Sequence, residues 1–136
     1  MFVPAGFATV APYLVVRDAS AYIDFIVAGL GGTHVGSSRR PDGTVANGQV
    51  RFGEGAQAAT VMVGEAWPDY TPGPTHLYLY VADADAAVAR AEAARAEVVM
   101  RAADRPYGDR QGGVRDRWGT TWWLSQRLTP EPYAFD

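Results

Sequence analysis

Cysteine is absent from this chain of 136 residues, which excludes disulfides, thiolate nucleophiles and zinc sites built on cysteine. Lysine is absent as well, so all 12 basic residues are arginine. The formal net charge is −3, and the arginines form no basic block. The chain therefore lacks the electrostatic footprint of a protein that binds nucleic acid.

Long apolar runs are also missing, because none approaches the roughly 18 residues that a membrane-spanning helix needs. The first ten residues, MFVPAGFATV, carry no positive charge of the kind that begins a secretory signal. We therefore expect a cytoplasmic protein with no membrane partner. The composition, 48% apolar and 20% charged, is typical of a globular protein, and the length predicts a single domain over 1–136.

An internal repeat organises the chain. The segment that starts at Tyr13 recurs at Tyr78, at an offset of 65 residues. Between 13 and 28 this offset aligns seven identical residues: Tyr13, Leu14, Val16, Asp18, Ala19, Ala21 and Ala28. An offset near half the chain length indicates two equivalent modules, which we place at about 8–65 and about 74–127.

Each module has the pattern strand, helix and three strands. In the first, we predict strands over 9–17, 33–39, 45–52 and 58–64, with a helix over 19–29 capped by Asp18. In the second, we predict strands over 75–81, 97–102, 111–115 and 120–127, with a helix over 83–95 capped by Asp83 or Asp85. Residues 1–7 are expected to form a loose lead-in, and 65–74 a proline-rich linker.

The most specific motif is YGDR at 107–110, followed by Gly113, Val114, Asp116, Gly119, Trp122 and Leu124. Together with the duplicated modules, this ending resembles the glyoxalase-like branch of the vicinal-oxygen-chelate superfamily, which includes glyoxalases, bleomycin-resistance proteins and extradiol dioxygenases. The resemblance implies an α+β fold in which two βαβββ modules form a half-barrel cup with the helices outside. It also implies a homodimer. We expect Asp109, Arg110 and Asp116 to be structural, and Arg39 and Arg40 to be solvated.

Metal-dependent members of that superfamily hold a divalent ion with four side chains. The resemblance places these ligands at Ala11, Met62, His76 and Trp123. Only His76 has a donor atom suited to such an ion, so we predict no metal and no other cofactor. No catalytic residue is firm. The candidate is His76, as a hydrogen-bonding or proton-transfer group, and the alternative is a strand histidine satisfied by a neighbour.

Strand alternation, combined with the implied cup, predicts a ligand-binding surface rich in aromatic rings. The residues that we assign to it are Tyr13, Asn47, Gln49, Arg51, Met62, Trp67, His76, Tyr78, Tyr80, Trp118 and Trp123. We expect Trp67 and Trp118 to lie at the rim and Arg51 to anchor an acidic or carbonyl group. An alternative is that the rings only fill a collapsed core.

The leading interpretation is a metal-independent protein that binds a small planar or aromatic organic molecule, of the drug-sequestering, bleomycin-resistance type. The alternative from the enzyme class is a lyase, isomerase or dioxygenase that uses His76 with a divalent metal or as a general base. A third interpretation is a scaffold whose cup is filled by side chains.

Overall fold

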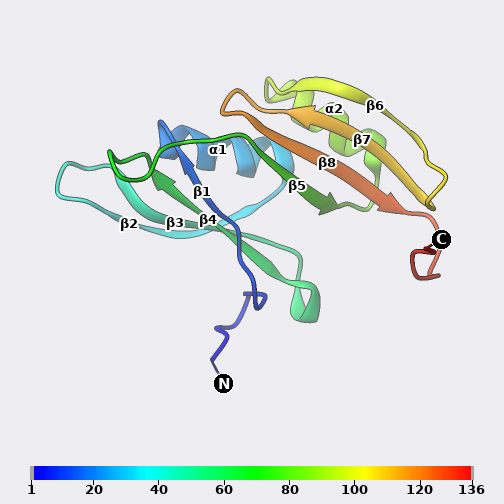
Figure 1. Ribbon diagram of the computed structural model, residues 1–136, viewed down its shortest axis with the longest axis horizontal. Helices are drawn as coiled ribbons and strands as arrows, with labels where there is room; N and C mark the ends of the chain where they lie inside the picture. Colours follow the sequence, from blue (N-terminus) through cyan, green and yellow to red (C-terminus); the bar gives the residue numbers. More distant parts are fainter. Residues whose placement is uncertain (1, 136) are drawn as a thin grey trace. The chain divides into compact units, whose positions relative to one another are not determined.

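The computed structural model describes residues 2–135, and the chain divides into two compact units between Gly73 and Pro74. Both units have the same order of elements, a strand, a helix and then three strands (Figure 1). The α+β class and the two βαβββ modules predicted from the sequence are confirmed. In the described part of the chain, no helix has the length and apolar character to cross a membrane.

Unit 1 holds one helix, a short 3-10 turn and a four-stranded sheet. Its elements are β1 (Tyr13–Val16), α1 (Ala19–Leu30), β2 (Thr33–Arg39), β3 (Val45–Phe52), η1 (Gly55–Gln57) and β4 (Ala59–Glu65). The strand order is β1-β4-β3-β2, in which β1 runs parallel to β4 and the other pairs are antiparallel.

Unit 2 repeats this topology. Its elements are β5 (Thr75–Tyr80), α2 (Ala84–Ala93), β6 (Glu97–Asp104), β7 (Asp109–Arg115) and β8 (Thr120–Arg127). The order β5-β8-β7-β6 matches that of unit 1 strand for strand, with β5 parallel to β8.

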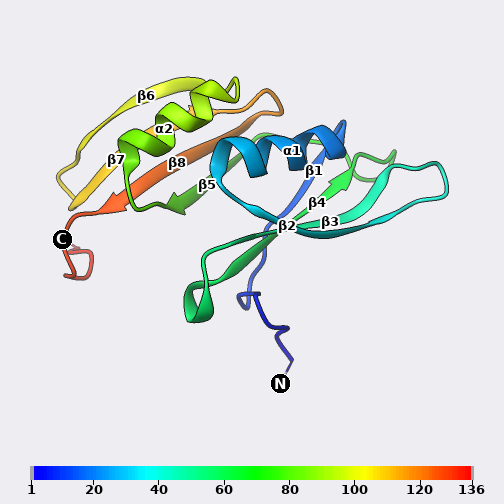
Figure 2. The same ribbon diagram turned by 180° about the vertical axis from the view of Figure 1, so that it is seen from behind.

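In each unit the helix covers one face of the sheet and forms the core with it; Figure 2 shows α2 lying against the strands of unit 2. Side chains alternate along each strand, so one set faces the helix and is buried. In unit 1 this set includes Leu14, Val16, Val50, Val61 and Val63, and in unit 2 it includes Val114, Trp122 and Leu124. The opposite face of each sheet is called its open face below.

Aspartates begin both helices, as the sequence predicts. The side chain of Asp18 accepts a hydrogen bond from the Ala21 N–H, and Asp83 accepts one from Ala86. Each thereby satisfies a backbone donor that the first helical turn leaves free. Asp85, the other candidate cap of α2, is paired with Arg110 instead.

The prediction of a first strand over 9–17 is wrong at its start, because β1 begins at Tyr13. The edge strand β1 pairs only with β4, whose register places Tyr13 opposite Met62. Pro12 has no N–H to donate to that ladder, although its carbonyl accepts from Met62. The sequence also gave no indication of η1, a single turn held by local backbone bonds.

Candidate ligand-binding site

Tyr13 lies flat on the open face of unit 1. Its hydroxyl donates to the carbonyl of Ala46 at 3.1 Å. The ring passes over Gly64, where an added Cβ would lie only 2.8 Å from the Tyr13 oxygen. The absence of a side chain at Gly64 therefore lets the tyrosine ring rest against the sheet, and about half of the Tyr13 side chain stays exposed.

Polar side chains continue this face along β3 and β4. The amide of Asn47 donates to the Met62 sulfur at 3.5 Å, and the amide of Gln49 donates to the Asn47 oxygen at 3.3 Å. All three side chains are half-buried. The structure thus brings together four of the residues that the sequence assigns to the site: Tyr13, Asn47, Gln49 and Met62.

Arg51 lies further along the same face, where the N-terminal segment crosses the sheet. The hydroxyl of Thr60 donates to the carbonyl of Gly6 at 2.7 Å, and Gly6 also packs against the Arg51 side chain. The prediction of a loose lead-in over 1–7 is therefore wrong at Gly6, because Thr60 holds it. Arg51 remains exposed.

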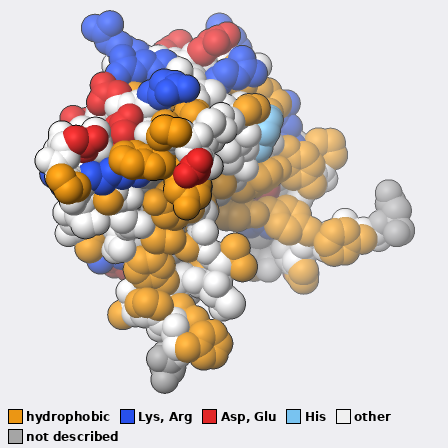
Figure 3. Space-filling model, turned by 60° about the vertical axis from the view of Figure 1, so that its left-hand side comes forward, with side chains coloured by type: hydrophobic (Ala, Val, Ile, Leu, Met, Phe, Trp, Pro, Cys, Tyr) orange, Lys and Arg blue, Asp and Glu red, His pale blue; other side chains and the backbone are white. Residues whose placement is uncertain are grey.

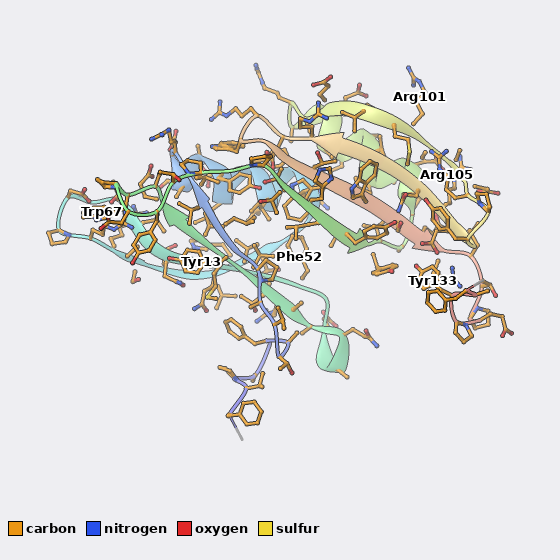
Figure 4. The ribbon with its side chains drawn as sticks, viewed as in Figure 1. Tyr13, Phe52, Trp67, Arg101, Arg105 and Tyr133 are labelled. Atoms are coloured by element: carbon orange, nitrogen blue, oxygen red, sulfur yellow. The ribbon has the colours of Figure 1, made fainter. Side chains whose placement is uncertain are left out.

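A cavity of about 440 Å³ opens beside Tyr13 in unit 1. Its lining residues are Tyr13, Val15, Arg40, Glu65 and Tyr70. Figure 4 labels Tyr13 and, further to the left in the same unit, Trp67. The volume falls within the range of roughly 300–1,000 Å³ that is common for sites of small organic ligands.

Arg40 contributes to the cavity, and the expectation that it is solvated is wrong. Its guanidinium lies 4.5 Å from the centre of the Trp67 ring and donates to the Glu65 carbonyl and the Thr44 hydroxyl. Sequence reasoning missed Arg40 because the contact joins the end of β2 to the linker after β4, which no local pattern reveals. Trp67 is itself held by paired backbone bonds with Tyr70.

Glu65, which also lines the cavity, binds the start of α1. Its two carboxylate oxygens accept from the backbone N–H groups of Asp18 and Ala19, each at 2.9 Å. A carboxylate at a helix N-terminus is favoured by both the free N–H groups and the helix dipole. The end of β4, which lines the cavity, is thereby tied to the start of α1.

The open face of unit 2 carries four aromatic residues of the predicted site. His76, Tyr78 and Tyr80 project from β5 and are exposed, and Trp123 projects from β8. The indole N–H of Trp123 donates to Nδ1 of His76 at 3.2 Å, and the two rings stack with centroids 6.0 Å apart. Figure 3, which brings the left-hand side of Figure 1 forward, shows hydrophobic side chains lying among charged ones.

Neighbouring tryptophans on β8 confirm the strand register. Trp122 is 1% exposed under α2, and its indole N–H donates to Asp116. Trp123 points to the open face and lies over Gly113, where a Cβ would be 2.6 Å from its ring. Trp118, also assigned to the site, lies on the turn before β8, where Arg117 stacks on its ring at 4.3 Å.

A chain of polar groups runs from the exposed Tyr107 to the buried side chains of Gln111 and Ser125, and sequence reasoning missed them as part of the site. The Tyr107 hydroxyl donates to Gln111 Oε1 at 2.6 Å, and the Gln111 amide donates to the Ser125 hydroxyl. Burial, followed by the nearby Tyr78 phenol, raises the pKa of Tyr107 above its ordinary value. The three groups therefore form a neutral hydrogen-bonded chain.

The motif residues Asp109 and Asp116 are structural, as expected. Asp116 accepts from the backbone of Trp118 and Thr120, which closes the β7–β8 hairpin. Asp109 is fully buried and pairs with Arg127 at 2.8 Å.

Comparison with known proteins decides the family. The model of the Glyoxalase/Bleomycin resistance protein/Dioxygenase superfamily matches residues 6–124. The chain belongs to this superfamily. An uncharacterised protein of Mycobacterium tuberculosis strain H37Rv is 34% identical over 127 residues, which cover 85% of this chain and 72% of that protein. A Mycobacterium bovis protein, also uncharacterised, is 34% identical, with 85% and 81% covered.

Solved structures share the superfamily fold. TioX from Micromonospora sp. ML1 has a TM-score of 0.72 and 24% identity, covering 89% of this chain and 99% of that one. TnmS3, an antibiotic-binding protein from Streptomyces sp. CB03234, has a TM-score of 0.68 and 21% identity, with 93% and 98% covered. At these identities, the likeness establishes the fold.

The residues present do not fit the divalent metal that some superfamily members bind. Of the four positions assigned to its ligands, Ala11, Met62 and Trp123 offer no oxygen or nitrogen lone pair suited to such an ion. Nδ1 of His76, at the fourth, accepts the Trp123 N–H. Within residues 2–135, no group of three or more His, Cys, Asp or Glu side chains is arranged to hold a metal ion.

Proposed function

We propose that this protein binds a small planar or aromatic organic molecule without a metal and sequesters it, as an antibiotic-binding or bleomycin-resistance-type protein does. The observation that carries the proposal is the cavity of about 440 Å³ in unit 1, bounded by the rings of Tyr13 and Tyr70. Aromatic walls offer flat apolar faces to a planar ligand, and Arg40 adds a charged group at one side.

We assign each site residue either an apolar or a polar contact with the ligand. Tyr13, Met62 and Trp67 provide apolar contact area, while Asn47, Gln49 and Arg51 provide directional polar contacts. In unit 2, the rings of His76, Tyr78, Tyr80, Trp118 and Trp123 provide a second stacking surface, separate from the unit 1 cavity. The antibiotic-binding description of TnmS3 agrees with this proposal at the level of ligand class.

Calorimetric titration with 2-naphthol, a flat two-ring probe, tests the proposal. Val15→Trp fills the cavity and should weaken binding at least about tenfold, because the ring loses the volume that it occupies. Val35→Trp is the matched control, since Val35 is an exposed strand valine outside the cavity lining. Failure of wild-type protein to bind, or equal binding by the Val15→Trp variant, would contradict the proposal.

A second variant addresses unit 2. Trp123→Ala removes the ring that stacks with His76 and should weaken binding by roughly 1–3 kcal/mol. The enzyme alternative, with His76 as a metal ligand or general base, instead predicts turnover or a bound divalent ion. A stoichiometric metal in purified protein would favour that alternative.

We also propose that the protein is a homodimer, as the superfamily resemblance implies. Analytical ultracentrifugation at micromolar concentration tests this, and a mass equal to one chain of 14.6 kDa would refute it.

A further inference from the structure

A chain of hydrogen bonds leads from the surface of unit 2 to a buried carboxylate. The phenol oxygens of Tyr80 and Tyr133 are 2.8 Å apart. The Tyr133 hydroxyl lies 2.7 Å from Oδ2 of Asp109, which is fully buried. Arg127 donates to the other oxygen of Asp109 at 2.8 Å and stacks over the Tyr133 ring at 4.0 Å. Figure 4 labels Tyr133 near the end of β8.

The direction of each hydrogen in this chain follows from its buried end. Both carboxylate oxygens of Asp109 accept hydrogen bonds, Oδ1 from the Arg127 guanidinium and Oδ2 from the Tyr133 hydroxyl. The single hydroxyl hydrogen of Tyr133 therefore points to Asp109. Tyr133 then has only lone pairs left for Tyr80, so Tyr80 must donate to it. The hydrogen of Tyr80 is directed inward, and its free lone pair is left for a ligand.

Tyr80 is accessible to such a ligand, because 57% of it is exposed. Its ring lies beside that of Tyr78, with centroids 6.1 Å apart and planes tilted by 41°. The hydroxyl hydrogen of Tyr107 is also directed inward, for an independent reason. Its hydrogen goes to Gln111 Oε1, which only accepts, while the Gln111 amide donates to Ser125.

We propose that the open face of unit 2 selects aromatic ligands that carry a hydrogen-bond donor, a hydroxyl or an amine, which donates to the phenol oxygen of Tyr80. This inference rests on the proposed function and narrows its ligand class. A ring that carries only a carbonyl acceptor would meet a lone pair at Tyr80 and gain no hydrogen bond there.

Equilibrium dialysis with three probes of similar shape tests the inference: naphthalene as reference, 2-naphthol as donor and 2-acetylnaphthalene as acceptor. The test uses the Val15→Trp variant, whose unit 1 cavity is filled, so that the open face of unit 2 is what the probes report. With naphthalene as the reference, this variant should bind 2-naphthol about three- to tenfold more tightly than 2-acetylnaphthalene, the size of one neutral hydrogen bond in water. Tyr80→Phe, added to Val15→Trp, keeps the ring and removes the phenol oxygen, so it should abolish this preference.

Tyr133→Phe gives a readout that a purely structural role would not produce. Without the Tyr133 oxygen, the Tyr80 hydroxyl is free to rotate and donate outward, so 2-acetylnaphthalene should bind several-fold more tightly than it does to wild type. If all three probes bind but Tyr80→Phe leaves their ratios unchanged, the inference is overturned and the proposed function stands. If no probe binds to wild-type protein, both fail.

Discussion

Trp122 and Trp123 are neighbours on β8 whose side chains lie in opposite environments. Trp122 is buried under α2 and satisfies Asp116, whereas Trp123 is half-buried on the open face. Trp122→Ala should lower the free energy of unfolding by about 3–5 kcal/mol, because it leaves a large cavity and removes the indole N–H that donates to Asp116.

Trp123→Ala is the matched comparison. Its ring covers Gly113 and His76 but has no core partner to lose, so the expected loss is below about 1.5 kcal/mol. Urea melts of both variants measure the difference. A larger loss for Trp123→Ala than for Trp122→Ala would show that the two side chains exchange faces.

The environment of Tyr133 predicts that the stability of the protein falls at high pH. Its hydrogen bond with Tyr80, then burial and the bond to Asp109, raise the pKa of Tyr133 above the ordinary tyrosine value. A group whose pKa is raised on folding contributes stability below its unfolded pKa, about 10, and that contribution is lost as the pH rises above it. Wild-type stability should therefore fall above pH about 10, and Tyr133→Phe should show a shallower fall.

The amino-acid composition removes the side chain that would otherwise titrate in the same pH range. With no lysine in the chain, tyrosines are the side chains that titrate near pH 10. Urea midpoints at pH 8 and above 10 give the comparison, with tyrosinate absorbance recorded in parallel. Parallel slopes for wild type and Tyr133→Phe would mean that Tyr133 ionises equally in the folded and unfolded states.

At the scale of elements, the start of α1 depends on a residue 46 positions away from Ala19 along the chain. Glu65 accepts from the Asp18 and Ala19 N–H groups in addition to the cap that Asp18 itself provides. Glu65→Ala should destabilise the protein by about 1–2 kcal/mol, because two backbone donors and the helix dipole lose their acceptor.

Glu65→Gln separates charge from hydrogen bonding, because the amide keeps one acceptor oxygen and loses the charge. Its expected loss is about half that of Glu65→Ala, read from urea midpoints. Equal stability of wild type and Glu65→Ala would mean that water replaces the carboxylate at these donors without loss.

At the scale of the whole molecule, the donor chemistry predicts that folding is independent of metal. Because Ala11, Met62 and Trp123 cannot ligate a divalent ion, we expect no metal binding to be coupled to folding. EDTA should therefore leave the melting temperature unchanged within about 1 °C, as measured by calorimetry. A decrease of several degrees, reversed by added divalent ion, would contradict this.

Local patterns were sufficient to predict the two modules. The repeat at an offset of 65, the aspartate caps and the alternation along strands depend on neighbours in the chain, and the boundaries of β2, β3 and β8 agree with the prediction. Strand alternation also separates Trp122 from Trp123, because successive side chains point to opposite faces whatever the partner strand is.

Only the tertiary structure decided which polar groups meet. Arg40 reaches Trp67, Glu65 reaches the start of α1, and Tyr133 reaches Asp109. Each contact joins residues far apart in the chain. Its contribution to stability depends on how buried the partners are and on which group donates, and local spacing in the sequence encodes neither. The polarity of Tyr80 is the clearest case, since a phenol can donate or accept until a buried carboxylate two hydrogen bonds away determines which it does.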